Sequence, residues 1–384
     1  MRYQLRYVRV ILRSRRNHIR RTARAANQGR RCTLDRHDGP VAKVAAARVG
    51  GRWAADLVEV TDDVSCLDDR GRWAVAVPYL GNPVCARFAR WGSEQPAAGA
   101  WRGPDPQDWT SSMSEAEYRA AVGGTREAIA AGTVYQANIC RVLTAPLPSP
   151  ADADILGLHM LLDAGNPAPY GGFLRLPDQG VHLACASPEL FLSVRVDGDD
   201  RLVRSGPIKG TGRTAEDLSD KDVAENVMIV DLVRNDLSQV CATGSVYVPD
   251  LLRVEEHPGL VHLVSYVTGV LVPGTGWAQV LAAAFPPGSV TGAPKHSALQ
   301  VIDSWEKAPR DFYCGAFGWV DADTGEAELA VTIRTFWIDG DVLRFGTGAG
   351  ITWGSDPGDE WRETELKASR LISVAGGTWQ ASGP

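Results

Sequence analysis

Two segments with helical patterns each carry a pair of acidic residues three positions apart. Asp222 and Glu225 form the first pair, and Glu360 and Glu363 form the second. Because residues i and i+3 share one face of a helix, each pair can direct two carboxylates toward one point. Carboxylate oxygens suit Mg²⁺, which usually keeps some water and binds substrate oxygens as well. The spacing is therefore compatible with a magnesium site, and it is also what two solvated acidic helix faces would show.

A lysine and two glycine-rich stretches could contribute to the same chemistry. Lys209 lies in a constrained segment between Pro207 and Gly210. A lysine amine that loses its proton can act as a covalent nucleophile, although an exposed loop charge is the simpler interpretation. The stretches Gly288–Lys295 and Gly346–Gly350 match neither a phosphate loop nor a dinucleotide fingerprint. Their backbone N–H groups could bind a carboxylate, or the glycines could simply form tight turns.

The elements that must position these residues are strands joined by turns, with helices between them. Apolar residues at helical spacing predict helices at residues 220–237, 277–284, 294–305 and 359–371. Strand patterns lie at residues 134–143, 181–185, 190–196, 260–271, 313–320, 328–338 and 342–345. Ser114 and Glu117 have the spacing of a capping box and open one more helix. The pattern predicts an α+β fold with large antiparallel sheets.

Charge is distributed unevenly along the chain. The first 31 residues contain eleven Arg and no Asp or Glu, whereas the whole chain has a net charge of -6. The body is therefore strongly acidic, which argues against nucleic acid as a partner. We interpret residues 1–34 as a basic, disordered arm, which could result from a start codon assigned too far upstream. A functional basic arm is the alternative.

Cysteine spacing and hydropathy bear on the compartment. The seven Cys residues are scattered without a C-x-x-C pair, which is typical of a reducing cytoplasm rather than of a disulfide framework or a zinc site. No run of apolar residues approaches the length of a membrane span, so we expect no membrane association.

Six segments in a fixed order carry a resemblance to a known family. They are Tyr135–Asn138, Ser187–Phe191, Pro207–Thr211, Ala224–Asp236, Phe285–Lys295 and Gly348–Ile351. Together they resemble the chorismate-binding enzymes, which include anthranilate, aminodeoxychorismate, isochorismate and salicylate synthases. The resemblance runs from about residue 115 to residue 373. It implies a single large α+β unit in which two antiparallel sheets pack together, with helices outside and the active site in a deep cleft.

The resemblance also implies a division of the chain. After the arm, residues 35–110 would form a shortened N-terminal part of the fold, and residues 111–375 would form the chorismate-binding core. Residues 376–384 would be a tail.

The resemblance assigns roles to individual residues. Glu225 and Glu363 would be the main ligands of Mg²⁺, which bridges to the ring carboxylate of chorismate. Asp222 and Glu360 would lie one shell out or act through water. Glu189 would be the general acid that protonates the departing C4 hydroxyl. The positions that line the substrate site would be Gln136, His262, Thr291, Tyr313, Arg334, Gly348, Ala349, Gly350 and Lys367.

Two positions discriminate within the family. Isochorismate and salicylate synthases resemble one another in a Lys that activates water at C2, and this chain has Gln136 there, which cannot serve as a base. Lys209 lies in a Pro-Ile-Lys-Gly-Thr segment similar to that of aminodeoxychorismate synthases. In that subgroup the lysine amine is thought to add at C2, and ammonia then adds at C4 and expels it. The resemblance thus implies amination at C4, in 4-aminobenzoate and folate biosynthesis.

Two other functions remain open from the sequence. An anthranilate synthase component would aminate C2, and a non-catalytic chorismate-binding subunit would bind without turnover. No segment resembles the Cys-His-Glu triad of a glutaminase, so we expect ammonia to come from a glutamine amidotransferase partner. Tryptophan feedback is not expected, because a Leu-Leu-Glu-Ser-type motif is lacking.

Overall fold

The computed structural model describes residues 43–257 and 260–379. The predicted arm, residues 1–34, and the end of the predicted tail lie outside the described residues. The six cysteines within them are all free, as the scattered spacing predicted. No described helix is both long and apolar enough to cross a membrane.

Helices form where the sequence provides amphipathic spacing and capping residues. The α-helices are α2 (Glu115–Ala130), α3 (Ile155–Gly165), α4 (Asp220–Ser238), α5 (Trp277–Ala284), α6 (Lys295–Trp305) and α7 (Pro357–Ala375). Short 3₁₀ turns are η2 (Val64–Asp68), η3 (Pro106–Asp108), η4 (Pro177–Gln179), η5 (Ala215–Asp217) and η6 (Gly288–Val290). The predicted capping box at Ser114 is confirmed, since its side chain accepts from Glu117 N and the Glu117 carboxylate accepts from Ser114 N.

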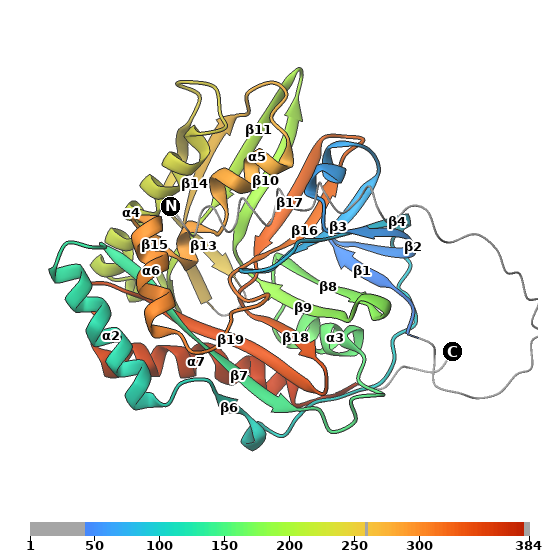
Figure 1. The fold of residues 1–384 in the computed structure, drawn as a ribbon, viewed down its shortest axis with the longest axis horizontal. Helices are drawn as coiled ribbons and strands as arrows, with labels where there is room; N and C mark the ends of the chain where they lie inside the picture. Colours follow the sequence, from blue (N-terminus) through green and yellow to red (C-terminus); the bar gives the residue numbers. More distant parts are fainter. Residues whose placement is uncertain (1–42, 258–259, 380–384) are drawn as a thin grey trace, which may run out of the picture.

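The strands form two antiparallel arms (Figure 1). The first arm runs in the order β2 (Arg52–Thr61), β1 (Ala46–Val49), β8 (Tyr170–Leu176), β9 (Val181–Ser187), β18 (Thr335–Asp339), β19 (Val342–Ile351) and β7 (Gln136–Pro146). Beyond it, β7 also pairs with β6 (Thr110–Ser111) and β15 (Gly292–Ala293). The site motifs of β7 and β19 thus lie toward one end of this arm.

The second arm carries the segment with Lys209. It runs in the order β3 (Arg72–Val77), β16 (Ala316–Asp321), β17 (Glu326–Val331), β10 (Leu190–Asp197), β11 (Asp200–Gly206) and β14 (Leu260–Val270). On β14 lie β12 (Ile208–Gly212) and β13 (Tyr247–His257). A separate pair is formed by β5 (Trp101–Arg102) and β20 (Thr378–Trp379).

The two arms are parts of one continuous hydrogen-bonded ladder. β4 (Val84–Gly92) pairs with β2 on one side and with β3 on the other, and every pairing in the ladder is antiparallel. The predicted α+β class is confirmed, and the two predicted sheets are joined through β4. Residues 46–92 contribute strands to both arms, so they form part of the same unit as the core.

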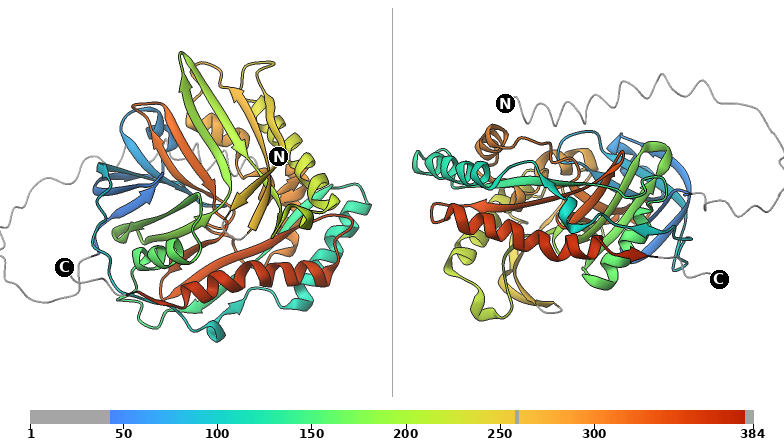
Figure 2. Two further views of the ribbon diagram at one scale, coloured as in Figure 1. Left: turned by 180° about the vertical axis from the view of Figure 1, so that it is seen from behind. Right: turned by 90° about the horizontal axis from the view of Figure 1, so that it is seen from below.

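The helices cover outer faces of the ladder, and the largest apolar core lies between the arms. α2 and α6 pack on β7, α7 packs on β19, and α4 packs on β14, as the two further views show (Figure 2). Side chains from β3, β10, β16 and β17 form the main core together with the buried faces of α4 and α5. This arrangement brings the first residues of α4 and of α7 near the ends of β7 and β19.

Candidate active site

Alternation along β7 and β19 separates a core face from a site face. Gly350 pairs with Asn138, and Gly348 pairs with Cys140. The residues that alternate with them along the two strands have the opposite orientation. They pack in an apolar cluster with α2 and α6, and they are Ala137, Ile139, Ala349 and Ile351. The glycines therefore lie on the face turned away from α2 and α6.

Gly350 is the point where several predicted site residues meet. A Cβ atom there would lie 2.3 Å from Gln136 Nε2, 3.3 Å from Glu225 Oε2 and 3.3 Å from Lys209 Nζ. Any side chain at Gly350 would therefore collide with Gln136. The glycine leaves room for the amide, the carboxylate and the amine to converge on one small space.

Lys209 is held in that space by two acceptors. Its Nζ donates to the backbone oxygen of Ser289 at 2.9 Å and lies 3.9 Å from Glu225 Oε2. The Lys209 side chain is only 11% exposed. The lysine therefore points into the site, and β12 carries it there beside α4.

The two acidic helices meet through lysines. Glu225 and Glu360 are buried, and Lys221 Nζ lies 3.9 Å from Glu225 Oε1 and 2.7 Å from Glu360 Oε1. Burial raises the pKa of Glu225, although Lys209 and Lys221 oppose the shift. Glu363 is 2.6 Å from Lys367 Nζ. The acids of α4 and α7 thus lie near one another, with the Lys221 ammonium between Glu225 and Glu360.

Lys367 connects α7 to the strand that carries the glycines. β18 pairs with β19 only over Val342–Phe345. Further along β19, Lys367 Nζ donates to Gly348 O at 3.2 Å. Two predicted site residues, Glu363 and Lys367, therefore lie beside the backbone of Gly348.

Glu189 lies in a poorly solvated part of the site. It is 3% exposed, and its Oε1 is buried without a hydrogen-bond partner. Burial raises the pKa of Glu189 to about 7, although Ser289, Lys209 and Arg334 oppose the shift. A carboxyl with such a pKa carries a proton in a large fraction of molecules at neutral pH, as a general acid requires.

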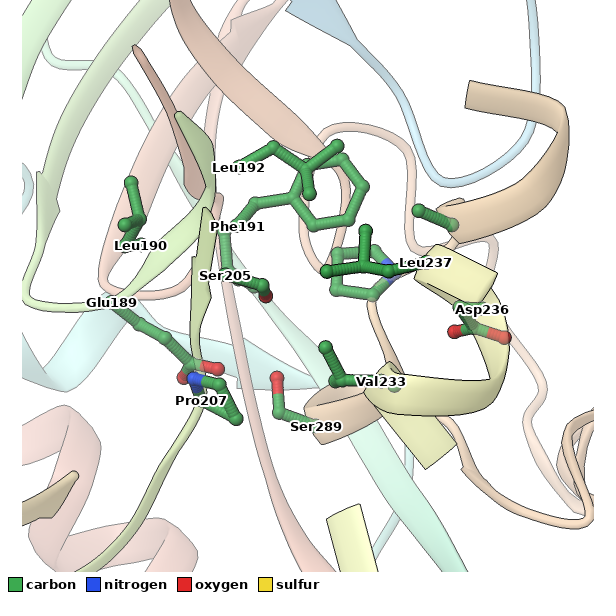
Figure 3. A pocket seen from close by; sticks show the side chains of 14 residues that line it. Glu189, Leu190, Phe191, Leu192, Ser205, Pro207, Val233, Asp236, Leu237 and Ser289 are labelled. Atoms are coloured by element: carbon green, nitrogen blue, oxygen red, sulfur yellow. The ribbon is translucent and has the colours of Figure 1, made fainter. Parts of the chain in front are cut away.

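A narrow pocket lies between Glu189 and the face of α4. Figure 3 shows the Glu189 carboxylate near Pro207 and Ser289, with Val233 and Asp236 of α4 on the other side. Most of the remaining lining is apolar, which accounts for the poor solvation of the Glu189 carboxyl.

The loop that follows α5 is fixed by buried charges that the sequence interpretation missed. Arg310 is 2% exposed and donates to Val290 O at 2.8 Å and to Asn138 O at 2.7 Å, besides pairing with Glu306. These bonds hold the backbone that follows Ser289 and Gln136 in place. Ser289 accepts from Lys209 through its carbonyl, and its side chain bonds to Glu189. Apart from Glu306, which is four residues from Arg310, these partners are distant in sequence, so spacing gave no signal for them.

A second buried pair fixes the end of the same loop. Lys295 Nζ lies 2.6 Å from Asp236 Oδ2 and also donates to Ala284 O at 3.0 Å. The lysine of the predicted glycine-rich stretch therefore joins α6 to α4 instead of facing the space beside Gly350.

Other predicted site residues have mixed positions. The Thr291 hydroxyl donates within its own loop, to Pro287 O and Gly288 O. His262 is buried on β14 beside Thr211. The ring of Tyr313 lies against Gly346, so a Cβ there would be 2.0 Å from its Cγ.

Three further predicted site residues also differ in what they contact. Arg334 lies just after β17 and near Glu189. Burial lowers the pKa of the Arg334 guanidinium, and the Glu189 carboxylate opposes this shift. Asp222 is used in the cap of α4, where its Oδ2 accepts from Ser219 N and Oγ. Ala349 belongs to the apolar cluster, so only its backbone can contact a ligand.

The donor set fits a hard divalent cation in its chemistry. No three acidic, His or Cys side chains among the described residues are grouped closely enough to bind one metal ion. Glu225, Glu360 and Glu363 nevertheless supply carboxylate oxygens, the ligand type of Mg²⁺. Glu360 Oε2 and Gln136 Oε1 are buried acceptors without a donor. The three carboxylates thus offer the right type of ligand, and in this structure each of them is paired with a lysine.

Comparison with known proteins identifies the class. A family model described as chorismate binding enzyme matches residues 67–373, most of the chain. The chain belongs to the chorismate binding enzyme family, and the resemblance seen in the six motifs is confirmed.

Relatives within the family have more than one activity. The chain is 37% identical to the aminodeoxychorismate synthase of Streptomyces pristinaespiralis over 340 residues, which cover 82% of this chain and 46% of that relative. It is 36% identical to the anthranilate synthase component 1 of Saccharolobus solfataricus over 280 residues, 70% of this chain and 64% of the relative. The chain therefore spans less than two thirds of the length of these curated relatives.

A solved structure shares the fold. The anthranilate synthase component I from Streptococcus pneumoniae aligns with a TM-score of 0.68 over 92% of this chain and 96% of that chain, at 21% identity. At that identity the likeness supports the fold alone.

Proposed function

We propose that this chain is the chorismate-aminating component of an aminodeoxychorismate synthase. The observation that carries the proposal is the placement of Lys209, whose amine lies beside Gly350 and Gln136 and near the acid Glu189. An amine in that position can act as a nucleophile, whereas Gln136 cannot activate water as a base. The similarity to the Streptomyces pristinaespiralis enzyme supports the same assignment.

In the first step the neutral Lys209 amine bonds to C2 of chorismate. Both ring double bonds shift along the ring, the C4–O bond breaks, and Glu189 donates the proton with which the hydroxyl leaves as water. The pKa of Glu189, raised to about 7 by burial, allows it to hold that proton at neutral pH. Arg334 and the backbone around Gly348 and Gly350 would hold the substrate carboxylates.

In the second step ammonia bonds to C4. The double bonds shift back, and the C2–N bond to the positively charged Lys209 nitrogen breaks, so that the amine leaves in its neutral form. The new C4 ammonium then returns one proton to the Glu189 carboxylate. Two allylic displacements leave nitrogen at C4, giving 4-amino-4-deoxychorismate. A glutamine amidotransferase would supply the ammonia, and the product would serve 4-aminobenzoate and folate biosynthesis.

Mg²⁺ would supply the positive charge that lets an acidic site accept a dicarboxylate. Glu225, Glu363 and Glu360 would hold it. Asp222 would act through the N-terminal turn of α4, because its carboxylate is bonded to Ser219.

A second activity is supported by the Saccharolobus solfataricus relative, an anthranilate synthase component. Incubation of the chain with chorismate, Mg²⁺ and ammonium distinguishes the two by product. Anthranilate is aromatic and fluorescent, whereas 4-amino-4-deoxychorismate is not aromatic and is recognised by mass. Failure to consume chorismate under these conditions would favour a binding subunit.

The covalent step has its own test. We expect Lys209→Ala to lose C4 amination, and the parent enzyme with chorismate but no ammonium to gain the mass of a ring adduct on the Lys209 peptide. Lys307→Ala is the matched control, because Lys307 forms an exposed pair with Glu117 away from the site. Full activity of Lys209→Ala would contradict the covalent mechanism.

A further inference from the structure

Lys221 lies between two buried carboxylates of different helices. Its Nζ is 2.7 Å from Glu360 Oε1 on α7 and 3.9 Å from Glu225 Oε1 on its own helix. The side chains of Glu360 and Glu225 are 3% and 10% exposed. Within residues 43–257 and 260–379, Lys221 is the basic side chain that pairs with Glu360, and Glu225 has Lys209 as its second partner.

Two carboxylates that are removed from water need a counter-charge nearby. An unpaired buried carboxylate costs several kcal/mol, and two of them also repel each other. Lys221 supplies one positive charge to the pair. The compensation is incomplete, because Glu360 Oε2 is buried and receives no hydrogen bond.

The lysine is not itself locked in this position. Its side chain is 39% exposed, and Lys221 belongs to the first turn of α4. A lysine has a flexible four-carbon stem, so the ammonium can leave for solvent while the helix stays in place. The two glutamates cannot follow it, because both are buried.

We infer that Lys221 takes, in the cation-free protein, the place between Glu225 and Glu360 that a divalent cation occupies, and that the cation expels it into solvent. The inference rests on the Mg²⁺ dependence in the proposed function, and it does not depend on whether C2 or C4 is aminated. Lys221 is a positioning residue that competes with the metal. When no cation is bound, its charge reduces the repulsion between the Glu225 and Glu360 carboxylates. The same charge weakens metal binding.

The first test compares metal binding and stability without any substrate. Lys221→Met keeps the length of the side chain and removes its charge. We expect calorimetric titration with MgCl₂ alone to give a dissociation constant lower by on the order of fivefold or more. We expect the melting temperature in EDTA to fall, and the rise in melting temperature on adding Mg²⁺ to become larger. Lys307→Met, in an exposed pair away from the site, should leave all three quantities unchanged.

The second test uses the parent protein and follows the lysine itself. Acylation of Lys221 by an N-hydroxysuccinimide ester, measured by peptide mass spectrometry, should increase when Mg²⁺ is added, because the amine moves into solvent. Acylation of Lys307 provides the internal reference. This readout separates displacement from a general effect of charge, and it is available even if Lys221→Met fails to fold.

The contrary results are equally distinct. Equal or weaker Mg²⁺ binding by Lys221→Met, or acylation of Lys221 that does not respond to Mg²⁺, would overturn the inference. If the parent protein binds no Mg²⁺, the inference fails together with the metal site. The choice between C2 and C4 amination is still decided separately by the product formed.

Discussion

Glu189 and Glu363 are two carboxyl groups of one site with opposite surroundings. Burial raises the pKa of Glu189 to about 7, and its Oε1 is left without a partner. Burial also acts to raise the pKa of Glu363, but Lys367, Lys221 and Lys209 together outweigh it and lower the pKa. The comparison shows how one residue type is assigned two tasks: an apolar wall keeps a proton available, and a lysine keeps a negative charge.

The largest effect is expected when the proposed proton donor, Glu189, is replaced. In Glu189→Gln the amide has the same shape but cannot release a proton to the leaving hydroxyl. We expect kcat for chorismate consumption to fall by about 10²–10⁴-fold, with a small change in KM, measured in steady-state assays with ammonium. If kcat of Glu363→Gln at saturating Mg²⁺ fell by as much as that of Glu189→Gln, the two carboxyls would not have different roles.

The next largest effect is expected at Glu363, the carboxyl group whose pKa is lowered. Glu363→Gln removes a carboxylate from the proposed cation site, so we expect the Mg²⁺ concentration for half-maximal activity to rise about 10–100-fold. The rate at saturating Mg²⁺ should recover most of its parent value. A titration of activity against Mg²⁺ at fixed chorismate measures both quantities. An unchanged Mg²⁺ requirement would exclude Glu363 from the metal site.

The pH dependence follows from the sign of the Glu189 shift. Its acid form is present below a pKa of about 7 and is lost above it, so kcat/KM should fall about tenfold per pH unit on the alkaline side. The hydrogen bond from Ser289 lowers this pKa. Ser289→Ala should therefore move the alkaline limb to higher pH. A shift to lower pH would contradict the assignment of that limb to Glu189.

The smallest expected effect is on folding stability. The Lys367 and Glu363 side chains are 49% and 45% exposed, so solvent screens their pair. We expect Lys367→Met to change the free energy of unfolding by less than about 1 kcal/mol in urea titrations. The pKa of Glu363 should rise as its closest positive charge is lost. A much larger loss of stability would mean that the Lys367–Glu363 pair also stabilises the fold.

Periodic patterns predicted the elements that hold the site. Helical spacing placed α4 and α7 and the faces that carry Glu225 and Glu360, because such spacing depends only on neighbours along the chain. The Ser114 capping box was predicted for the same reason. β13 was missed, although it pairs with β14 over most of its length. Its alternation is interrupted by two register shifts against β14.

Contacts between distant residues were not available from periodicity. Arg310 fixes Asn138 and Val290, and Ser289 contacts Glu189 and Lys209, yet none of these pairs has a recognisable spacing. A local signal did exist for Asp222, since Ser219 precedes it by three residues as in a capping box. Family motifs supplied the candidate site residues, whereas the position of the Lys221 ammonium between Glu225 and Glu360 required coordinates.

The pairing of β7 with β19 has a consequence for the order in which the molecule is completed. Ala137 faces Ile351, so the surface that carries Gln136 and Gly350 joins two stretches separated by about half of the chain. A nascent polypeptide that has emerged only as far as β17 contains Glu189, Lys209 and Glu225 but lacks β19, the strand that places Gly350 beside Gln136. The surface that carries Gln136 and Gly350 can therefore form only after β19 has been synthesised.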